Sequence, residues 1–588
     1  MSYVHPAADA EFVLRHIVDL DALCASAGLE EVNTDLALAV LEEAGKLGSD
    51  VLAPLNWSGN LQGIRLGTNG VQEADGFADA YRQFAEGGWM SLTAPEDFGG
   101  QHLPQSIGTA VSEIWNSANL SFALCPLLGQ GAVESLIHHG SKALQQTYLP
   151  KLVSGEWTGT MNLTESDAGT DLAAIKTRAV PTDDHYLISG QKIFITWGDH
   201  QMAGNIIHLV LARLPDAPPG VKGISLFIVP KFLPDVAGEP GERNAVQCIS
   251  VEHKLGIHAS PTCVMEFSEA KGFLVGLANN GLACMFTMMN HARQAVGLQG
   301  LAISERAYQQ ALSFAKERLQ GTRRDGSRMP IIQHPDVRRM LMVMKAANEA
   351  MRALALTAAA EIDRAHYAPE GDSKARHAHR VELYTPIIKG WLTEMAVELT
   401  SIGIQVHGGM GFIEETGAAQ HFRDARILPI YEGTNGIQAL DFIGRKTLAN
   451  QGTVLQGLLD DMAITLTELA SAELPPSIQA GFAQALASGV AARAFVLEQA
   501  GTDPQLANSV CHPFLMLFGY LCGGWVMAQS ALKAKALLDA GEGHAEFLQA
   551  KLITAQCYAE HLLPRVQACH ATVLAGSGSV MALPEDLF

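Results

Sequence analysis

A glutamate in the C-terminal half of the sequence has neighbours that suit a general base. In Tyr431-Glu-Gly-Thr-Asn-Gly436, Glu432 lies between an aromatic residue and a glycine. A carboxylate beside apolar groups can have its pKa raised to roughly 6–7, which suits a base at neutral pH, and Gly433 lets a ligand approach the backbone closely. A solvated loop glutamate would show the same pattern, so Glu432 indicates a catalytic base only in combination with other segments.

Two earlier segments contain residue types that hold a planar or anionic ligand. Met161-Asn-Leu-Thr-Glu-Ser-Asp-Ala-Gly-Thr-Asp171 combines small residues, hydroxyls and backbone N–H groups that can cradle a polar ring or a phosphate. Gly190-Gln-Lys-Ile-Phe-Ile-Thr-Trp197 is a strand-like run in which Phe194 or Trp197 could stack on a ring. Each also has a plain structural interpretation, a turn for the first and core packing for the second.

Several common ligand-binding motifs are missing. The sequence contains no H-E-x-x-H, no G-x-x-x-x-G-K-[ST] phosphate loop and no G-x-G-x-x-G after a strand. We therefore expect no metal site and no ordinary Rossmann dinucleotide site. The Gly408-Gly409-Met410-Gly411 cluster follows a helical pattern and by itself indicates the end of a helix.

The hydrophobic period divides the chain into helical and β regions. Helical patterns run to about Lys151, short β-branched runs bounded by Gly, Pro, Asn and Asp predict strands over 159–273, and a helical period returns at Gly281. Strands and helices do not alternate, which favours a separate β domain over a parallel α/β sheet. The predicted fold class is mainly α with a central β domain. The expected domains are N-terminal helical (1–158), β (159–276), helical bundle (277–452) and C-terminal helical (453–588).

Some helix ends are also marked in the sequence. Thr34 caps a helix that we expect to end between Gly45 and Gly48. His334-Pro335 opens a helix with one apolar face. Leu474-Pro475-Pro476 divides the last helical stretch in two.

Charge and cysteine usage disfavour several classes of protein. Lys and Arg number 40 against 61 Asp and Glu, a net charge of −21, which argues against nucleic-acid binding and against docking on anionic lipid through basic residues. The nine cysteines are scattered without a C-x-x-C, and the sequence starts without a basic and apolar secretory leader. We expect a reduced, cytoplasmic protein.

An uncharged and largely apolar stretch runs from Pro504 to Leu532. Pro513 and several glycines interrupt it, and the unbroken apolar part is shorter than the ~20 residues that a bilayer requires. We interpret it as a buried helix and not as a transmembrane span, with contact at a membrane surface as the alternative.

Taken together, the three chemistry-bearing segments resemble the acyl-CoA dehydrogenase family of flavoproteins. T-E-x-x-A-G-T-D, G-x-K-x-F-I-T and Y-E-G-T occur at these separations and in the family's order of helical, β and helical regions, over most of residues 30–450. The resemblance implies a helical domain, a β-barrel-like domain and a four-helix-bundle domain, here with the extra C-terminal helical domain of the family's long form. It also implies FAD, held between the β domain and the following bundle.

The resemblance implies flavin contacts at the positions that match the family's motifs. Phe194 stands where the family usually has Trp, so it would stack without an indole donor. Arg318 matches an arginine that reaches the FAD diphosphate of a neighbouring subunit, but the following Gln320-Gly-Thr-Arg-Arg departs from the family's R-x-x-F-G, and a basic surface turn is the alternative. The implied cofactor-binding residues are Met161, Leu163, Thr164, Gly169, Thr170, Phe194, Thr196, Arg318, Gln405, Val406, Gly409 and Thr434.

The reaction implied by the resemblance is FAD-dependent α,β-dehydrogenation of an acyl-CoA thioester to the trans-2-enoyl-CoA, as in fatty-acid β-oxidation. Glu432 would remove the α-proton while the flavin takes hydride from the β-carbon, and the backbone N–H of Glu432 with a flavin hydroxyl would stabilise the thioester oxygen. Substrate contacts are implied for Thr170, Arg293, Tyr431 and Gly433. The acyl chain would be that of 3-methylmercaptopropionyl-CoA or of a fatty acyl-CoA.

The implied partners are an acyl-CoA and an electron-transferring flavoprotein, and a homodimer is the preferred assembly. Three alternatives stay open on the residues. An acyl-CoA oxidase would use the same residues and pass electrons to oxygen, whereas a non-catalytic flavoprotein or binding scaffold would need no base. A nucleic-acid-binding relative would need a basic C-terminal region, but residues 460–473 are acidic-leaning.

Overall fold

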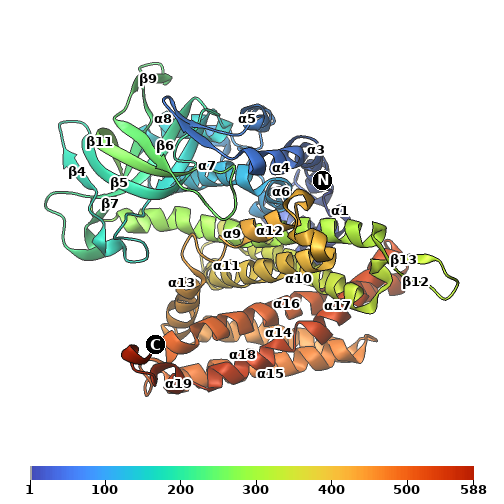
Figure 1. Ribbon diagram of the computed structural model, residues 1–588. Coiled ribbons are helices and arrows are strands. Elements are labelled where there is room, and N and C mark those ends of the chain that lie inside the picture. The colour runs from blue at the N-terminus through green and yellow to red at the C-terminus, as the bar shows by residue number, and fades with distance from the viewer. Residues whose placement is uncertain (1–2) are drawn as a thin grey trace. The chain divides into compact units, whose positions relative to one another are not determined.

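The computed structural model describes residues 3–588, which form two compact units (Figure 1). Most of the first unit is residues 43–103 and 114–295, and the second contains residues 5–42, 104–113 and 296–588. Helices, then a β region, then helices again follow one another along the chain, which confirms the predicted fold class. The four-domain division of the sequence stays a prediction.

Seven strands of the first unit form one sheet that closes on itself. They are β3 (Trp157–Asn162), β4 (Arg178–Pro181), β5 (Tyr186–Thr196), β6 (Asn205–Arg213), β7 (Ile224–Pro230), β10 (Val246–Val251) and β11 (Thr262–Val275). β5 pairs with β11 and β4, β6 pairs with β4 and β7, and β7 returns to β11, so that these strands form a ring. Most pairs are antiparallel, while β3 and β4 pair with β6 in parallel. This is the β-barrel-like domain that the resemblance implies.

Both faces of the central strands are buried. Leu209, Leu211 and Ile228 pack with residues of α7 (Leu120–His139) and α8 (Lys142–Ser154). The alternate residues Val210 and Phe227 pack with residues of β5 and β11. Because successive side chains of a strand point to opposite faces, most positions of β6 and β7 are apolar, with His208 and Ser225 as fully buried polar exceptions. This is why their runs stand out in the sequence.

The α-helix that begins at Thr34 ends at Leu47, between Gly45 and Gly48 as predicted, but the helical backbone does not stop there. α3 (Thr34–Leu47) continues through a π-helical turn at Gly48–Leu52 into α4 (Ala53–Gln62). Gly48 is buried, and a Cβ at this position would lie 2.7 Å from Cγ2 of Ile114. This glycine allows close packing and does not end the helical backbone.

Four further helices precede the sheet in the chain, and three short strand pairs form hairpins outside it. The other helices there are α1 (Ala7–Val13), α2 (Leu20–Ser26), α5 (Phe77–Glu86) and α6 (Gln105–Ala118). The two-stranded pairs are β1 (Arg65–Gly67) with β2 (Gly70–Gln72), β8 (Phe232–Pro234) with β9 (Pro240–Arg243), and β12 (Leu319–Thr322) with β13 (Arg328–Pro330).

Long helices dominate the second unit. α9 (Gly281–Glu317) enters it at residue 296 and is followed by α10 (Pro335–Tyr367), which begins at His334-Pro335 as predicted, and α11 (Asp372–His407). A Cβ at Gly297 or Gly300 would come within 2.5 or 2.6 Å of atoms of Ile388 or Leu392, so these glycines let α9 approach α11. The shorter α12 (Ala418–Ala425) and α13 (Asn435–Leu440) follow.

The C-terminal region adds six helices and the predicted break at Pro475-Pro476. They are α14 (Thr453–Ser471), α15 (Pro476–Gln499), α16 (Leu506–Ala540), α17 (Ala545–His561), α18 (Arg565–Leu574) and α19 (Gly578–Met581), drawn in orange and red in Figure 1. α16 lies against α11, where the ring of Trp391 fills the space beside Gly519 and Gly523.

Within the described residues 3–588, three helices are long and apolar enough to cross a membrane by length and composition alone, namely α7, α15 and α16. Of the most apolar window of α16, 89% is buried inside the protein, against 33% for α15. The uncharged stretch at 504–532 is therefore a buried helix, as the glycines and Pro513 within it indicated.

The cysteines behave as small apolar residues. All nine are free thiols, and seven of them are buried. Burial raises the pKa of the Cys522 thiol to about 12, so this group is protonated at neutral pH.

Among residues 3–588, no group of three or more His, Cys, Asp or Glu side chains is placed to hold a metal ion.

Candidate active site

The turn that contains Glu432 lies between α12 and α13 in the second unit. Glu432 is partly buried, and its φ of +58° is a left-handed conformation that costs a non-glycine residue roughly 1–2 kcal/mol. Gly433 follows with a φ of +85°, which glycine adopts without a Cβ clash. Strain of this kind persists only where the surrounding structure holds it.

Hydrogen bonds hold the turn at both ends. The backbone N–H of Asn435 donates to the carbonyl of Pro429 at 2.9 Å and closes the turn, and Thr434 Oγ1 caps the first turn of α13. The hydroxyl of Tyr431 donates to Oε1 of Gln299 on α9. Burial raises the pKa of Tyr431 well above its usual range, so the phenol stays a neutral donor.

The side chain of Asn435 anchors the turn to α11. Asn435 is 4% exposed, and its Nδ2 donates to Oγ1 of Thr393 and Oε1 of Glu394, each at 2.9 Å, and to the Gly390 carbonyl at 3.2 Å. Its Oδ1 accepts from Nζ of Lys389 at 2.9 Å. Lys389 is fully buried, so the turn is attached to the interior of the helical unit.

The loop that contains the first motif follows β3 in the first unit. The carboxylate of Glu165 accepts a bond from Nζ of Lys192 at 2.8 Å and bonds from the backbone N–H and hydroxyl of Thr177 at 3.1 and 2.6 Å. Lys192 also donates to the carbonyl of Leu163 at 2.9 Å. A buried ion pair on β5 therefore sets the path of the loop.

Both groups of this pair are charged at neutral pH. Burial alone would raise the pKa of Glu165, but the Lys192 ammonium and the bonds from Thr177 and Lys176 outweigh it and lower the pKa. Burial lowers the pKa of Lys192 to about 8, which still leaves the ammonium mostly protonated at pH 7.

The two aromatic residues of the second motif have opposite environments. Phe194 is 58% exposed on β5 with a φ of +61°, an outlier for a bulky residue. Trp197 is fully buried, donates from Nε1 to the Ser121 carbonyl at 3.1 Å, and stacks on Phe77 with ring centroids 6.4 Å apart. The stacking role considered for Trp197 is therefore wrong because its ring belongs to the core, while the ring of Phe194 is accessible.

The other implied flavin contacts lie in both units. In the first, Met161, Leu163, Thr164 and Thr196 are partly buried, and Gly169 and Thr170 are exposed; in the second, Arg318, Gln405, Gly409 and Thr434 are exposed and Val406 is buried. A Cβ at Gly169, Gly408 or Gly409 would meet no heavy atom of the protein within 4 Å. In the first unit, the open space beside Gly169, the hydroxyls of its loop and the accessible ring of Phe194 fit a planar, polar group. In the second unit, the open space beside Gly408 and Gly409 leaves room for a ligand.

Arg293 lies on the first half of α9, in the first unit, and is 5% exposed. Its guanidinium lies 5.7 Å from the ring centroid of Phe286, and Nη1 donates to Oδ1 of Asn290 at 3.2 Å. A guanidinium stays charged at any physiological pH. Arg293 is thus a fixed cation in a poorly solvated place, where its attraction for an anionic group is stronger than at the surface.

Two lysines that hold these segments were not expected from the sequence. Lys192 and Lys389 received no role there, although each is the only cation in its run, Tyr186–Trp197 and Tyr384–Leu392. Lysine is almost never fully buried without a partner. A lone lysine inside an apolar run is the signal that could have found both.

Family models match successive parts of the chain. They are described as "Acyl-CoA dehydrogenase, N-terminal domain" (residues 68–156), "Acyl-CoA dehydrogenase, middle domain" (160–270), "Acyl-CoA dehydrogenase, C-terminal domain" (279–448) and "Acetyl-CoA dehydrogenase C-terminal like" (448–584). The matches include the loop at 161–171, the turn at 431–436 and the C-terminal helices.

Relatives of known name align along nearly the whole chain. It is 48% identical over 586 residues to 3-methylmercaptopropionyl-CoA dehydrogenase of Ruegeria pomeroyi, covering 99% of each chain. It is 33% identical to a butyryl-CoA dehydrogenase of Syntrophomonas wolfei subsp. wolfei, covering 100% of this chain and 99% of the relative. Among solved structures, an acyl-CoA dehydrogenase complexed with FAD from Bacillus anthracis has the same fold, with a TM-score of 0.74, 21% identity, and coverage of 95% of this chain and 90% of that one.

Proposed function

The chain belongs to the acyl-CoA dehydrogenase family, and we propose that it converts an acyl-CoA thioester to the trans-2-enoyl-CoA with Glu432 as the base. The observation that carries this assignment is the turn at Glu432, where a carboxylate is kept in a strained left-handed conformation. Such strain tends to occur at functional sites, where geometry matters more than stability. The enzyme is an oxidoreductase.

The cofactor of this family is FAD, which is bound in the structurally similar acyl-CoA dehydrogenase of Bacillus anthracis. When bound, it accepts the hydride from the β-carbon of the acyl chain. The loop held by Glu165 and Lys192 would offer hydroxyls and backbone N–H groups to its ring, and Phe194 would offer a stacking face. In the second unit, Arg318 would bind the diphosphate of the cofactor in a neighbouring subunit. The other residues proposed to contact FAD are Met161, Leu163, Thr164, Gly169, Thr170, Thr196, Gln405, Val406, Gly409 and Thr434.

The residues of the turn account for the proton transfer. The backbone N–H of Glu432 donates to the thioester oxygen, which makes the α-proton acidic by stabilising the charge that develops there. The carboxylate of Glu432 takes this proton, and Gly433 leaves room for the acyl chain beside the backbone. Arg293 supplies a fixed positive charge for the anionic CoA part, and Thr170 and Tyr431 complete the proposed substrate contacts.

The proposed base is tested by replacing Glu432 with Gln. Glu432→Gln keeps the size and the polar character of the side chain, so the protein should retain bound flavin. Anaerobic reduction of the flavin by acyl-CoA should fall by about 10³-fold or more, because a positioned base contributes roughly 10²–10⁴-fold. Glu415→Gln, at an exposed glutamate before α12, is the matched control. Bleaching of Glu432→Gln at the wild-type rate would rule out this base.

The first candidate substrate is 3-methylmercaptopropionyl-CoA. The support is the 48% identity over 99% of the relative that carries this name, while the match to a butyryl-CoA dehydrogenase keeps short straight chains as the second candidate. We expect kcat/KM for either to exceed that for a long-chain acyl-CoA by about tenfold or more, since each methylene that a pocket cannot accept costs about 1 kcal/mol or more. A maximum at long chains in a steady-state series would reverse this order.

The proposed electron acceptor is an electron-transferring flavoprotein. An oxidase would use the same base and flavin, so the two are separated by the fate of the electrons. We expect reduction of an added electron-transferring flavoprotein and, in air without it, little peroxide per substrate consumed. Stoichiometric peroxide would instead identify an oxidase.

The proposed setting is a cytoplasmic homodimer that takes part in β-oxidation. A dimer is favoured because the C-terminal helices add mass that could replace further subunit contacts. Light scattering should give twice the chain mass of 62.8 kDa. Contact with a membrane surface is the alternative, and co-sedimentation of the protein with liposomes tests it. Such contact would involve α15, whose most apolar window is only 33% buried.

A further inference from the structure

A buried lysine and a carboxylate bind opposite ends of the Asn435 side chain. Nζ of Lys389 donates to Oδ1, and Nδ2 donates to Oε1 of Glu394, both at 2.9 Å. A primary amide has its negative end at oxygen and its positive end at nitrogen, so an ammonium on one side and a carboxylate on the other favour a single orientation. Thr393 bonds to both ends of the amide from the same helix.

Glu394 is ionised in this arrangement. His512 of α16 lies with Nε2 at 3.4 Å from Oε1 of Glu394. The hydrogen bond from His512 outweighs the effect of burial, and with the bond from Asn435 it lowers the pKa of Glu394. The carboxylate therefore keeps its charge at neutral pH and continues to orient the amide.

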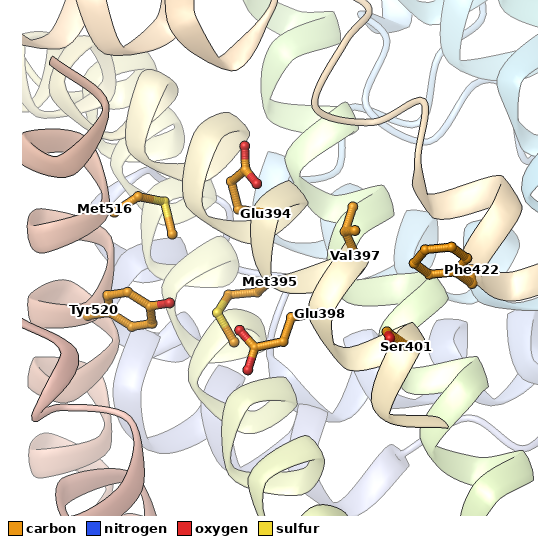
Figure 2. Close-up of a pocket in the computed structure, with 8 residues that line it drawn as sticks. All are labelled: Glu394, Met395, Val397, Glu398, Ser401, Phe422, Met516 and Tyr520. Carbon is orange, nitrogen blue, oxygen red and sulfur yellow. The ribbon is translucent and has the colours of Figure 1, made fainter. Parts of the chain in front are cut away.

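The outer end of this chain of bonds borders a pocket of the second unit. The pocket has a volume of 390 Å³ and is lined by Glu394, Met395, Val397, Glu398 and Ser401 of α11, Phe422 of α12, and Met516 and Tyr520 of α16 (Figure 2). Figure 2 shows the carboxylates of Glu394 and Glu398 apart from one another. Arg565 binds both oxygens of Glu398 at 2.6 Å, so the charge of Glu398 is matched locally and Glu394 is the carboxylate that serves Asn435.

The same residue that receives these bonds also closes the turn of Glu432. Asn435 is three positions after Glu432, and its backbone N–H holds the Pro429 carbonyl. Its side chain is fixed to α11, a helix of 36 residues. Asn435 therefore attaches the C-terminal end of the Glu432 turn to α11, and loss of its side-chain bonds would remove this attachment.

We propose that Lys389, Asn435 and Glu394 form a positioning relay that holds Glu432 in the conformation from which it takes the α-proton. The relay rests on the proposed function of Glu432 as the base. Its three members act through the turn and are positioning residues. Through His512, the relay also gives the C-terminal region a role in the site, because α16 supports the outer carboxylate.

Two variants and their combination test the relay. Asn435→Ala should slow anaerobic flavin reduction by acyl-CoA about 30- to 100-fold, since a misplacement of about 1 Å can cost 10²-fold. Lys389→Met should slow it about 10-fold. The double variant should be no slower than Asn435→Ala if Lys389 acts on the reaction through that amide. Multiplied losses in the double variant would overturn the relay.

Further measurements separate positioning from a loss of structure. The affinity for a trans-2-enoyl-CoA, followed by the change in flavin absorption, should stay within about threefold of the wild type, since product binding does not need a correctly placed base. The isotope effect with an α-deuterated substrate should rise in the relay variants as proton removal becomes rate-limiting. An unchanged isotope effect together with a weakened affinity would contradict the relay.

Lys551→Met is the matched control. Lys551 is another buried lysine of the second unit, and it bonds to Asp9 and Glu349 at 2.6 and 2.9 Å. This variant should lower the melting temperature but keep flavin reduction within about twofold. If it slows the reaction as much as Lys389→Met does, the effect is a general loss of stability and the relay is wrong.

The outcomes distinguish this proposal from the proposed function. If Glu432→Gln keeps full flavin reduction, the base assignment fails. If Glu432→Gln abolishes reduction while Asn435→Ala keeps the wild-type rate, only the relay fails.

Glu394→Gln keeps an acceptor oxygen but not the charge, and it replaces Asn435→Ala if that variant does not fold. It should slow flavin reduction about 3- to 10-fold at a near wild-type melting temperature, and an unaltered rate would count against the relay.

Discussion

The loop proposed to hold the flavin and the turn proposed to hold the base are both fixed by a buried lysine, but the lysines act differently. In the first unit, Lys192 bonds directly to the carboxylate of Glu165 at 2.8 Å. In the second, the amide of Asn435 separates Lys389 from the carboxylate of Glu394. Each arrangement supports a segment with a left-handed, non-glycine residue, Phe194 on β5 and Glu432 in the turn.

The difference lies in what remains if a lysine is removed. Loss of Lys192 would leave the buried carboxylate of Glu165 without its counter-ion, whereas loss of Lys389 would leave a neutral amide with one missing donor. A direct ion pair makes a rigid support for a loop that offers backbone groups. In the amide-bridged form, Asn435 joins the turn of Glu432 to the partly exposed carboxylate of Glu394. We expect this arrangement to affect the position of Glu432 more than the stability of the protein.

The largest expected effect is on stability and comes from the two lysines. Lys192→Met should lower the free energy of unfolding by about 3–5 kcal/mol because it leaves a buried charge unpaired. Lys389→Met should cost about 1–3 kcal/mol, the price of an unsatisfied buried polar group. Urea unfolding of both variants, followed by circular dichroism, measures the difference. Equal costs would mean that the two supports are not distinct in kind.

The next effect concerns the exposed ring of Phe194. Phe194→Leu removes an aromatic face, so the affinity for FAD should fall by about 5- to 10-fold, in line with an aromatic stacking contribution of about 1 kcal/mol. Flavin dissociation followed by fluorescence measures this affinity. Phe194→Trp, which restores the residue usual in the family, should bind flavin at least as tightly as the wild type, and the Leu variant binding as tightly would remove Phe194 from the cofactor site.

A smaller effect is expected from pH, and only in the first unit. Because the pKa of Lys192 is about 8, raising the pH from 7 to 9 removes most of its charge, which weakens its bond to Glu165 and loosens the loop. Flavin affinity should fall about threefold over this range. Lys192→Arg keeps its charge throughout and should lose the pH dependence. A wild type and an Arg variant with the same pH profile would show that the Lys192 charge does not control the loop.

The smallest effect is expected at the outer end of the second support. His512→Ala removes a single bond of 3.4 Å to Glu394, whose side chain is 33% exposed. Since water can replace a partner at a partly exposed carboxylate, flavin reduction should slow by less than about threefold. If His512→Ala slows flavin reduction as much as Lys389→Met does, the residues of α16 hold the turn at least as strongly as those of α11.

Local signals predicted the elements of this fold well, and tertiary contacts explain the errors. His334-Pro335 and Pro475-Pro476 mark helix boundaries because proline restricts its own backbone and that of its neighbour. Gly48 marks the end of α3 but not the end of the helical backbone, because this glycine is needed for close packing against Ile114. The stacking role considered for Trp197 is wrong because a sequence pattern cannot distinguish an aromatic ring that stacks on a ligand from one that packs in the core, here on Phe77.

By itself, the sequence determined the order of helical and β regions, the family motifs and the glutamate to be tested, since each depends on residues that are close together in the chain. Only the tertiary structure decided which charges meet. Glu165 and Lys192 are 27 positions apart and Lys389 and Asn435 are 46 apart, separations that no helical or strand period connects. Their contacts arise because burying an apolar strand or helix forces a lysine within it to find its partner on whichever segment packs alongside.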